Sequence, residues 1–211
     1  MSKFFSILFF SLLFHASQSI AQKIFSEGVI KYDVYLKGSS SPDGIYVISV
    51  KGGMIKQEWA MNNGFNNVTI YNQKTGITLS LNVKNGGKYA LEITQEELKT
   101  KNKRFEQAQF NDINETKKIV GYHTKGNKVT YKNGDQVDIF YTSELIPQNE
   151  SFNTMFPGLK GIPLEYITLA SGNNTMKFLA TLVEIKVLDS KEFSIPADYK
   201  IVTKAELESL K

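Results

Sequence analysis

Ile77-Thr78-Leu79-Ser80-Leu81-Asn82-Val83 has the most regular alternation of apolar and polar residues in the chain. Because successive side chains of a β-strand point to opposite faces of the sheet, this period of two predicts a strand with one apolar and one polar face. Turn signals bound the stretch, at Asn72 to Gly76 and at Asn85-Gly86-Gly87. We expect its aliphatic side chains to face a core and its hydroxyl and amide side chains to face water.

Similar short strands lie on both sides of this stretch. Turn signals such as Ser41-Pro42-Asp43-Gly44 and Gly52-Gly53 separate them. Short strands in close succession are typical of an antiparallel meander. The strands predicted in this part of the chain are Glu27–Lys37, Ile45–Val50, Met54–Met61, Val68–Tyr71 and Lys88–Ile93.

The pattern changes at Thr94-Gln95-Glu96-Glu97, which has the spacing of a helix capping box. Apolar residues that follow, such as Leu98 and Phe105, share a thin helical face, so we expect a helix that lies across the apolar side of the sheet. Whether this helix moves as a lid is left open. Thr203-Lys204-Ala205-Glu206 repeats the spacing before a short terminal helix.

Strand patterns return in the second half of the chain, with an Asn133-Gly134 hairpin signal and a turn at Ser171 to Asn174. Strands with one solvent-facing polar side cannot bury their apolar side unless the sheet curls or is capped. The roughly ten strands therefore predict a mostly β fold: a curled antiparallel sheet, or incomplete β-barrel, partly closed by a helix and loops. The later predicted strands are Glu115–Ile119, Tyr122–Tyr131, Gln136–Tyr141, Leu164–Leu169 and Thr175–Leu188.

The segment from Met155 to Tyr166 combines two prolines and two glycines with large apolar side chains. Proline and glycine disfavour a helix or a central strand there. Contiguous exposed apolar surface is uncommon on soluble proteins. We therefore expect the fold to cover this loop, or the loop to cover something apolar.

The first 21 residues have the features of a secretory signal peptide: a basic start, a short apolar run from Phe4 to Phe14, and small residues before a cleavage site after Ala21. The apolar run is too short to span a bilayer, and no later stretch replaces it. The chain has no cysteine, which excludes a lipid anchor on cysteine and any disulfide. We expect a periplasmic, single-domain mature protein of residues 22–211 whose oligomeric state the sequence does not specify.

The charge pattern excludes a nucleic-acid-binding role. The formal net charge is +4, lysines and acids are interleaved, and Arg104 is the single arginine. A nucleic-acid-binding surface usually has clustered arginines and stacking aromatics. Peripheral contact with an anionic membrane surface remains compatible with this charge.

No motif indicates catalysis or a bound metal. With His15 in the signal peptide, His123 is the one histidine of the mature chain, and it has no spacing typical of a catalytic triad. Asp112 to Thr116 resembles the start of a calcium loop but lacks the required glycine and closing glutamate. We therefore expect a protein that is not an enzyme and has no metal and no cofactor.

Several motifs resemble a known family. Pro157-Gly158-Leu159-Lys160-Gly161-Ile162-Pro163-Leu164-Glu165-Tyr166 is the most specific, together with Ile119 to Tyr122, Phe140 to Thr142 and Phe193 to Lys200. They resemble an uncharacterised family of exported proteins grouped with the LolA/LolB lipoprotein carriers. The resemblance implies an incomplete barrel with helices on its concave side and an apolar cavity, which such carriers use for acyl chains.

These observations predict a periplasmic binding or carrier protein for a lipid, an acyl chain or a lipidated protein. The alternative is a cell-envelope interaction or structural module whose barrel is filled by its own side chains, with a protein partner. A hydrolase would need His123 beside a hydroxyl and a carboxylate. The residues predicted to line the cavity or its lid are Trp59, Met61, Phe156, Leu159, Ile162 and Leu164.

Overall fold

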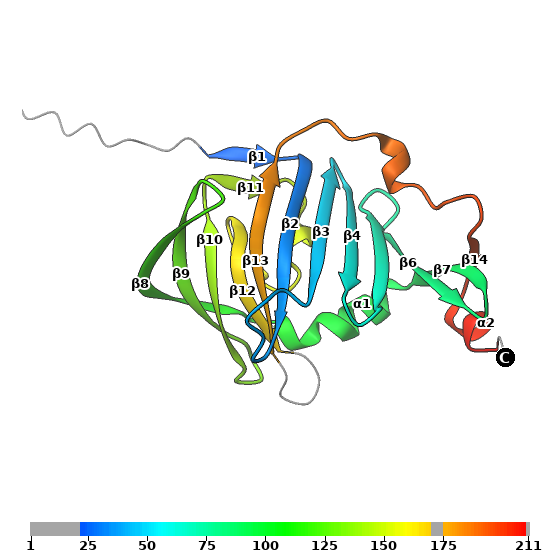
Figure 1. Ribbon diagram of the computed structural model, residues 1–211, viewed down its shortest axis with the longest axis horizontal. Coiled ribbons are helices and arrows are strands. Elements are labelled where there is room, and N and C mark those ends of the chain that lie inside the picture. The colour runs from blue at the N-terminus through cyan, green and yellow to red at the C-terminus, as the bar shows by residue number, and fades with distance from the viewer. Residues whose placement is uncertain (1–21, 170–174, 210–211) are drawn as a thin grey trace, which may run out of the picture.

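The computed structural model describes residues 22–169 and 175–209. The predicted signal peptide and the turn from Ser171 to Asn174 lie outside the described residues. Strands dominate the described chain (Figure 1). They are β1 (Lys23–Phe25), β2 (Glu27–Leu36), β3 (Gly44–Lys51), β4 (Met54–Met61), β5 (Asn66–Asn72), β6 (Ile77–Lys84), β7 (Gly87–Ile93), β8 (Gln109–Ile119), β9 (Tyr122–Thr130), β10 (Gln136–Thr142), β11 (Leu145–Pro147), β12 (Ile162–Leu169), β13 (Thr175–Glu184) and β14 (Lys200–Val202).

Within the described residues, one 12-stranded sheet contains all of these strands except β1 and β11, which pair with each other in parallel. Its order is β14-β7-β6-β5-β4-β3-β2-β13-β12-β10-β9-β8. The sheet curls but does not close, because its end strands β14 and β8 do not pair with each other. The predicted mostly β fold with a curled, largely antiparallel sheet is thus confirmed, and β2 to β7 form the predicted meander.

The helices connect or flank the sheet. They are α1 (Gln95–Asn102), η1 (Lys103–Phe105), η2 (Glu150–Asn153), η4 (Ser190–Phe193) and α2 (Lys204–Ser209). The capping box predicted at Thr94 is present, with Thr94 and Glu97 bonding each other's backbone amides. Thr203 and Glu206 make the corresponding bonds before α2.

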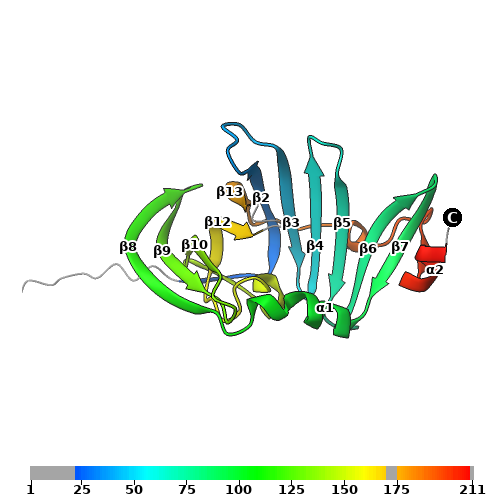
Figure 2. The ribbon, with the colours of Figure 1, turned by 90° about the horizontal axis from the view of Figure 1, so that it is seen from below.

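The path of α1 follows from the sheet order. β7 and β8 are consecutive in the chain but lie near opposite ends of the sheet. The segment between them, residues 94–108, must therefore cross from one end to the other. In Figure 2 this segment runs along one side of the sheet, with α1 below β4 and β5.

The part of the sheet from β2 through β13 to β8 encloses the main core. Tyr166 and Phe178 stack with ring centroids 4.6 Å apart, and Tyr32 packs edge-on against both rings. Phe156 adds a fourth ring, 5.5 Å from Tyr166. The chain's own side chains therefore fill this half of the curled sheet.

The prediction for the two faces of β6 is wrong. Thr78 and Ser80 are buried at 3% and 9% exposure, whereas Ile77 and Val83 are 37% and 68% exposed. The register of the sheet explains this result: Thr78 and Ser80 share a face with Tyr71 and Thr69 of β5, which is the concave face. The aliphatic residues of β6 lie on the outer face.

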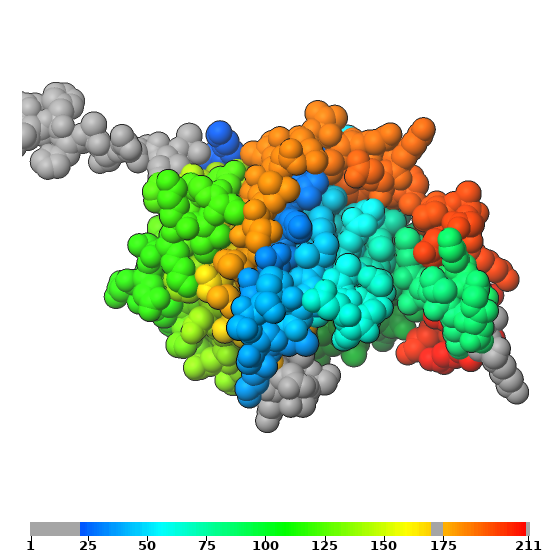
Figure 3. Space-filling model, in the orientation of Figure 1, coloured from blue at the N-terminus to red at the C-terminus, as the bar shows by residue number. Residues whose placement is uncertain are grey.

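A second apolar cluster lies outside the main core. Ile70 of β5 and Ala90 of β7 are paired with the outward-facing Leu79 and Leu81 of β6 and are themselves buried. Leu188 and Phe193 of the C-terminal segment are also buried, and η4 packs against β4. Figure 3 shows this segment in orange and red along the upper edge and the right end of the molecule. We call residues 185–202 the C-terminal cover.

Candidate binding groove

A groove of about 1270 Å³ lies between the concave face of β3–β7 and the segment that crosses it. Strand pairing places alternate residues of each strand on this face, in rows that run from one strand to the next. The α1–η1 segment and the chain around Met155 form the opposite wall. The residues of the sheet and of the β4–β5 turn that line the groove are Tyr46, Ile55, Gln57, Trp59, Phe65, Asn67, Thr69, Tyr71, Thr78, Ser80 and Ile93.

One end of the groove is aromatic. Trp59 of β4 pairs with Tyr46 of β3, and their ring centroids are 4.5 Å apart. Phe178 packs edge-on against the indole at 5.4 Å, which fixes the ring between the core and the groove. Burial raises the pKa of Tyr46 far above its ordinary value, so this phenol stays neutral. Aromatic faces held in this way suit apolar ligands.

The floor beside this aromatic pair is polar and uncharged, and Asn67 of the floor pairs directly with Trp59. Asn67 donates to the hydroxyl of Ser80 at 3.0 Å, and its side-chain oxygen accepts from Thr69 at 3.1 Å. Gln57 lies in the same row as Thr69 and Ser80, and its amide makes no hydrogen bond within the described residues. The floor can therefore hydrogen-bond a polar part of a ligand as well as water.

The wall opposite the sheet is attached mainly at its ends. None of the residues of α1 is buried. Gln95 at its start donates to the carbonyl of Gly76. At its far end Phe105 is buried against Tyr131, with ring centroids 5.4 Å apart, and Arg104 donates to the carbonyl of Leu169 at 3.3 Å. The middle of the wall is polar and charged: Leu98 and Asn102 are half-buried, whereas Lys99, Thr100 and Lys101 are exposed along the border of the groove.

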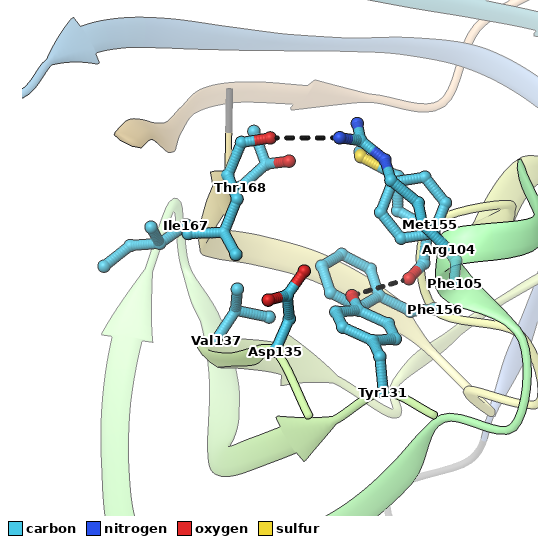
Figure 4. A pocket seen from close by; sticks show the side chains of 10 residues that line it. Arg104, Phe105, Tyr131, Asp135, Val137, Met155, Phe156, Ile167 and Thr168 are labelled. Carbon is cyan, nitrogen blue, oxygen red and sulfur yellow. Dashed lines mark hydrogen bonds between the residues drawn. The ribbon is translucent and has the colours of Figure 1, made fainter. Parts of the chain in front are cut away.

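Figure 4 shows the far end of this wall. Tyr131 donates its hydroxyl to the carbonyl of Met155 at 2.8 Å, and Arg104 lies over the ring of Phe105 at 4.5 Å. The pocket that these side chains line together with Asp135 holds only about 10 Å³ of free space. This region is therefore a packed junction between the wall and the filled half of the sheet, with no room for a ligand.

The six residues predicted to line a ligand cavity are in two different environments. Trp59 lines the groove, whereas Met61 and Leu159 are partly buried against the core. Phe156, Ile162 and Leu164 are at most 2% exposed inside the core. Contact of any of the six with a ligand stays a prediction.

The proline-glycine loop closes the filled half of the sheet. Asn153, itself 8% exposed, donates its side-chain amide to the carbonyls of Leu159 and Gly161. Gly161 lies so close to Thr142 and Tyr141 that no side chain fits there. The loop thus buries its own apolar side chains and covers the apolar core. Of the two expectations stated for it, this is the one in which the loop covers something apolar.

Sequence reasoning missed the polar floor and Tyr46 as groove residues. Ser80, like Thr78, was expected to face water because it is polar, and neither Gln57 nor Thr69 was named as a ligand-contacting residue. The shared row of Gln57, Thr69 and Ser80 across three strands could have been found from the meander register. What the sequence could not reveal was that this row faces inward.

His123, the one histidine of the mature chain, lies on the surface. The ring of His123 is 72% exposed, and its Nδ1 is 3.3 Å from the carboxylate of Glu144. No hydroxyl group bonds the ring in the part of the chain that the structure describes. The segment from Asp112 to Thr116, the weak calcium-loop match, forms a bulge in β8, where Asp112 accepts a hydrogen bond from the amide of Asn114.

No family model matches the chain, and no curated protein matches it. Among solved structures, PNGF-II is similar with a TM-score of 0.50 and 13% identity, over 86% of this chain and 32% of that one. The complex of MucA and MucB from Pseudomonas aeruginosa gives a TM-score of 0.46 and 12% identity, over 85% of this chain and 59% of that one. The chain thus spans about a third and three fifths of these two structures.

A LolA superfamily protein from Nitrosomonas europaea gives a TM-score of 0.38 and 6% identity, over 82% of this chain and 92% of that one. At such identities a likeness describes the fold alone. Within residues 22–169 and 175–209, no helix is long and apolar enough to cross a membrane. The solved structures similar in fold include this member of the LolA superfamily.

Proposed function

We propose that this protein is a periplasmic, non-enzymatic binding or carrier protein that holds the acyl chain of a lipid or lipidated partner in the groove. The observation that carries the proposal is the position of Trp59: its indole, packed against the buried ring of Tyr46, lines a groove that the protein's own side chains leave open. The mature unit is residues 22–211, acting as one domain.

The size of the groove supports an acyl ligand. Small-molecule sites typically have volumes of about 300–1,000 Å³, so about 1270 Å³ accommodates a lipid chain and part of its head. Each buried methylene contributes roughly 0.8 kcal/mol, so about ten methylenes correspond to micromolar affinity before any polar contact is counted. Apolar groove residues such as Ile55, Phe65 and Met155 add to this contact surface.

The residue that contacts the chain most directly is Trp59, with the buried Tyr46 packed against its ring and Met61 beside it. Met61 packs against the core next to the aromatic end of the groove. In this proposal, Phe156, Leu159, Ile162 and Leu164 support the site from the core and the loop that seals it. Their replacement would act on ligand binding through the shape of the sheet.

Trp59 provides a direct test because it is the single tryptophan of the chain. Its fluorescence should be quenched by fatty acids brominated along the chain and not by unbrominated acids of the same length. Brominated acid that binds the protein without quenching Trp59 would place the ligand elsewhere. A Trp59→Ala variant that folds and still binds with unchanged affinity would also contradict the proposed site.

A second candidate function is a cell-envelope module that binds a protein partner. The side-chain-filled half of the sheet favours it, because no ligand space remains between Tyr166, Phe178 and Phe156. Native mass spectrometry of residues 22–211, with organic extraction of co-purifying molecules, separates the two. A bound lipid at defined stoichiometry supports the carrier, and a mass unchanged by added fatty acids and phospholipids supports the protein-binding module.

A further inference from the structure

We infer that the ligand of the groove is an anionic amphiphile, whose chain lies toward Trp59 and whose acidic head lies against the α1–η1 wall. This inference rests on the proposed function and adds to it the chemical class of the head group. Four cationic side chains carry it, all within residues 99–104 and all lining the groove: Lys99, Lys101, Lys103 and Arg104.

These cations are not neutralised by the protein. None of the four forms an ion pair with a carboxylate in the part of the chain that the structure describes. Lysines elsewhere do so, as in the pairs Lys51–Glu27 and Lys128–Asp138. Arg104 makes its hydrogen bond to a backbone carbonyl and not to a carboxylate. The wall therefore carries positive charge available to a ligand.

The rest of the groove does not cancel this charge. Glu96 and Glu106 are the two acidic residues among those that line it, against four cations. Glu97, the other acid of the first turn, is held by the backbone and side chain of Thr94 in the capping box. The floor contributes amides and hydroxyls only. An anion in the groove thus meets an excess of positive charge over a neutral floor.

The arrangement also fits an amphiphile rather than a small anion. The cationic wall includes Leu98 and is followed by the buried Phe105, and it faces the sheet row that ends in Ile93. The free amide of Gln57 lies in the polar floor, one row from Trp59, where it can donate to an oxygen of the head group. A small inorganic anion would leave the apolar part of the groove without a partner.

The test compares two lysophospholipids with the same acyl chain, lysophosphatidylglycerol and lysophosphatidylcholine, below their micelle concentrations. Binding is followed by Trp59 fluorescence and by native mass spectrometry. We expect the anionic lipid to bind on the order of tenfold more tightly at low salt, and the ratio to fall toward one as salt screens the exposed charges.

The variant Lys99→Gln/Lys103→Gln should weaken binding of lysophosphatidylglycerol roughly five- to tenfold and leave lysophosphatidylcholine unchanged. Lys37→Gln/Lys118→Gln is the matched control: it removes the same charge from exposed positions outside the groove. Thermal melts of both variants exclude a general loss of folding.

The outcomes separate the two proposals. Equal affinity of the wild-type protein for both lipids would contradict the inference that the ligand has an anionic head group. It would leave the proposed carrier function intact. Failure of both lipids to bind would overturn the carrier function itself. An equal loss in the control variant would show that net charge, and not the α1–η1 wall, attracts the lipid, which also overturns the inference.

Discussion

The backbone amide of Leu188 donates a hydrogen bond of 2.8 Å to the carboxylate of Glu27, 161 positions earlier in the chain. Lys51 binds the same carboxylate at 2.5 Å and the carbonyl of Leu188 at 2.8 Å. Three distant parts of the chain, β2, β3 and the C-terminal cover, therefore meet at one carboxylate. This contact connects the end of the chain to the middle of the sheet.

The Glu27 contact predicts a specific dependence of stability on pH. The hydrogen bond from Lys51, followed by that from the Leu188 amide, lowers the pKa of Glu27 below its ordinary value of 4.5. A carboxyl whose pKa is lowered by folding stabilises the folded state above the unfolded pKa, and this contribution is lost as pH falls through the folded pKa. Glu27→Gln should therefore be less stable than wild type at pH 7, and the difference should shrink as the pH falls below 4.5 and through the pKa of the folded state.

Chemical denaturation at pH 7 and at pH 3 measures this difference. Glu92→Gln serves as the control, since Glu92 is exposed on β7 and forms no ion pair among the described residues. A destabilisation by Glu27→Gln that is the same at both pH values would contradict the lowered pKa of Glu27 as the source of the effect.

The C-terminal cover should contribute strongly to stability through Leu188. Its side chain is 6% exposed, whereas that of the neighbouring Val187 is 86% exposed. Leu188→Ala should lower the free energy of unfolding by about 2–4 kcal/mol because it removes buried methyl groups and leaves a cavity. Val187→Ala should change it by less than about 0.5 kcal/mol. Similar effects of the two replacements in urea unfolding would show that the cover is not packed as described.

Replacement of two phenylalanines should separate effects on protein stability from effects on ligand binding. Phe156 is 2% exposed in the core, whereas Phe65 lines the groove and is 55% exposed. Phe156→Ala should cost about 3–5 kcal/mol of stability. Phe65→Ala should leave stability nearly unchanged and weaken acyl-chain binding several-fold. The two readouts are urea unfolding and titration of Trp59 fluorescence, and a Phe65 variant with full affinity would remove that residue from the site.

Gly161 should not tolerate a side chain. A Cβ atom there would overlap the carbonyl oxygen of Thr142 and meet the ring of Tyr141 at 2.8 Å. Gly161→Ala should therefore destabilise the protein by more than about 2 kcal/mol. Gly53→Ala is the comparison, because its nearest neighbour is the exposed side chain of Gln73 at 3.2 Å. A thermal melt in which both variants unfold at the wild-type temperature would contradict the tight packing of the loop.

The sequence could predict the strands but not which face of each strand is inside. Alternation in Ile77 to Val83 correctly predicts a strand, since β6 spans Ile77–Lys84. It does not specify the inner face: the polar Thr78 and Ser80 are buried on the concave face, while the apolar Ile77 and Val83 are exposed on the outer face. A period of two identifies two faces, whereas burial depends on segments far away in the chain. The three-residue strands β1, β11 and β14 are too short to show a period at all.

The sequence identified only part of the candidate site, because it does not show which group covers an apolar residue. Trp59 stood out as a large aromatic residue on an alternating strand, and it lines the groove. The apolar loop stood out equally, but Phe156 and Ile162 are buried in the core. Apolarity marks a need for burial, and the same signal arises whether the covering group is a ligand or the protein. The polar floor has no such signal, because its amides and hydroxyls look like surface.

The pairing of β2 with β13 constrains the order in which the molecule can assemble. Tyr32 pairs with Ala180, so the seam between the meander and the filled half joins the beginning of the chain to its C-terminal part. Contacts between such distant segments form slowly, because a long loop must close before they are made. Until β13 has been synthesised and docked, β2 is an unpaired edge of the meander. Any factor that keeps the growing chain from aggregating must therefore shield that first long strand until the end of synthesis.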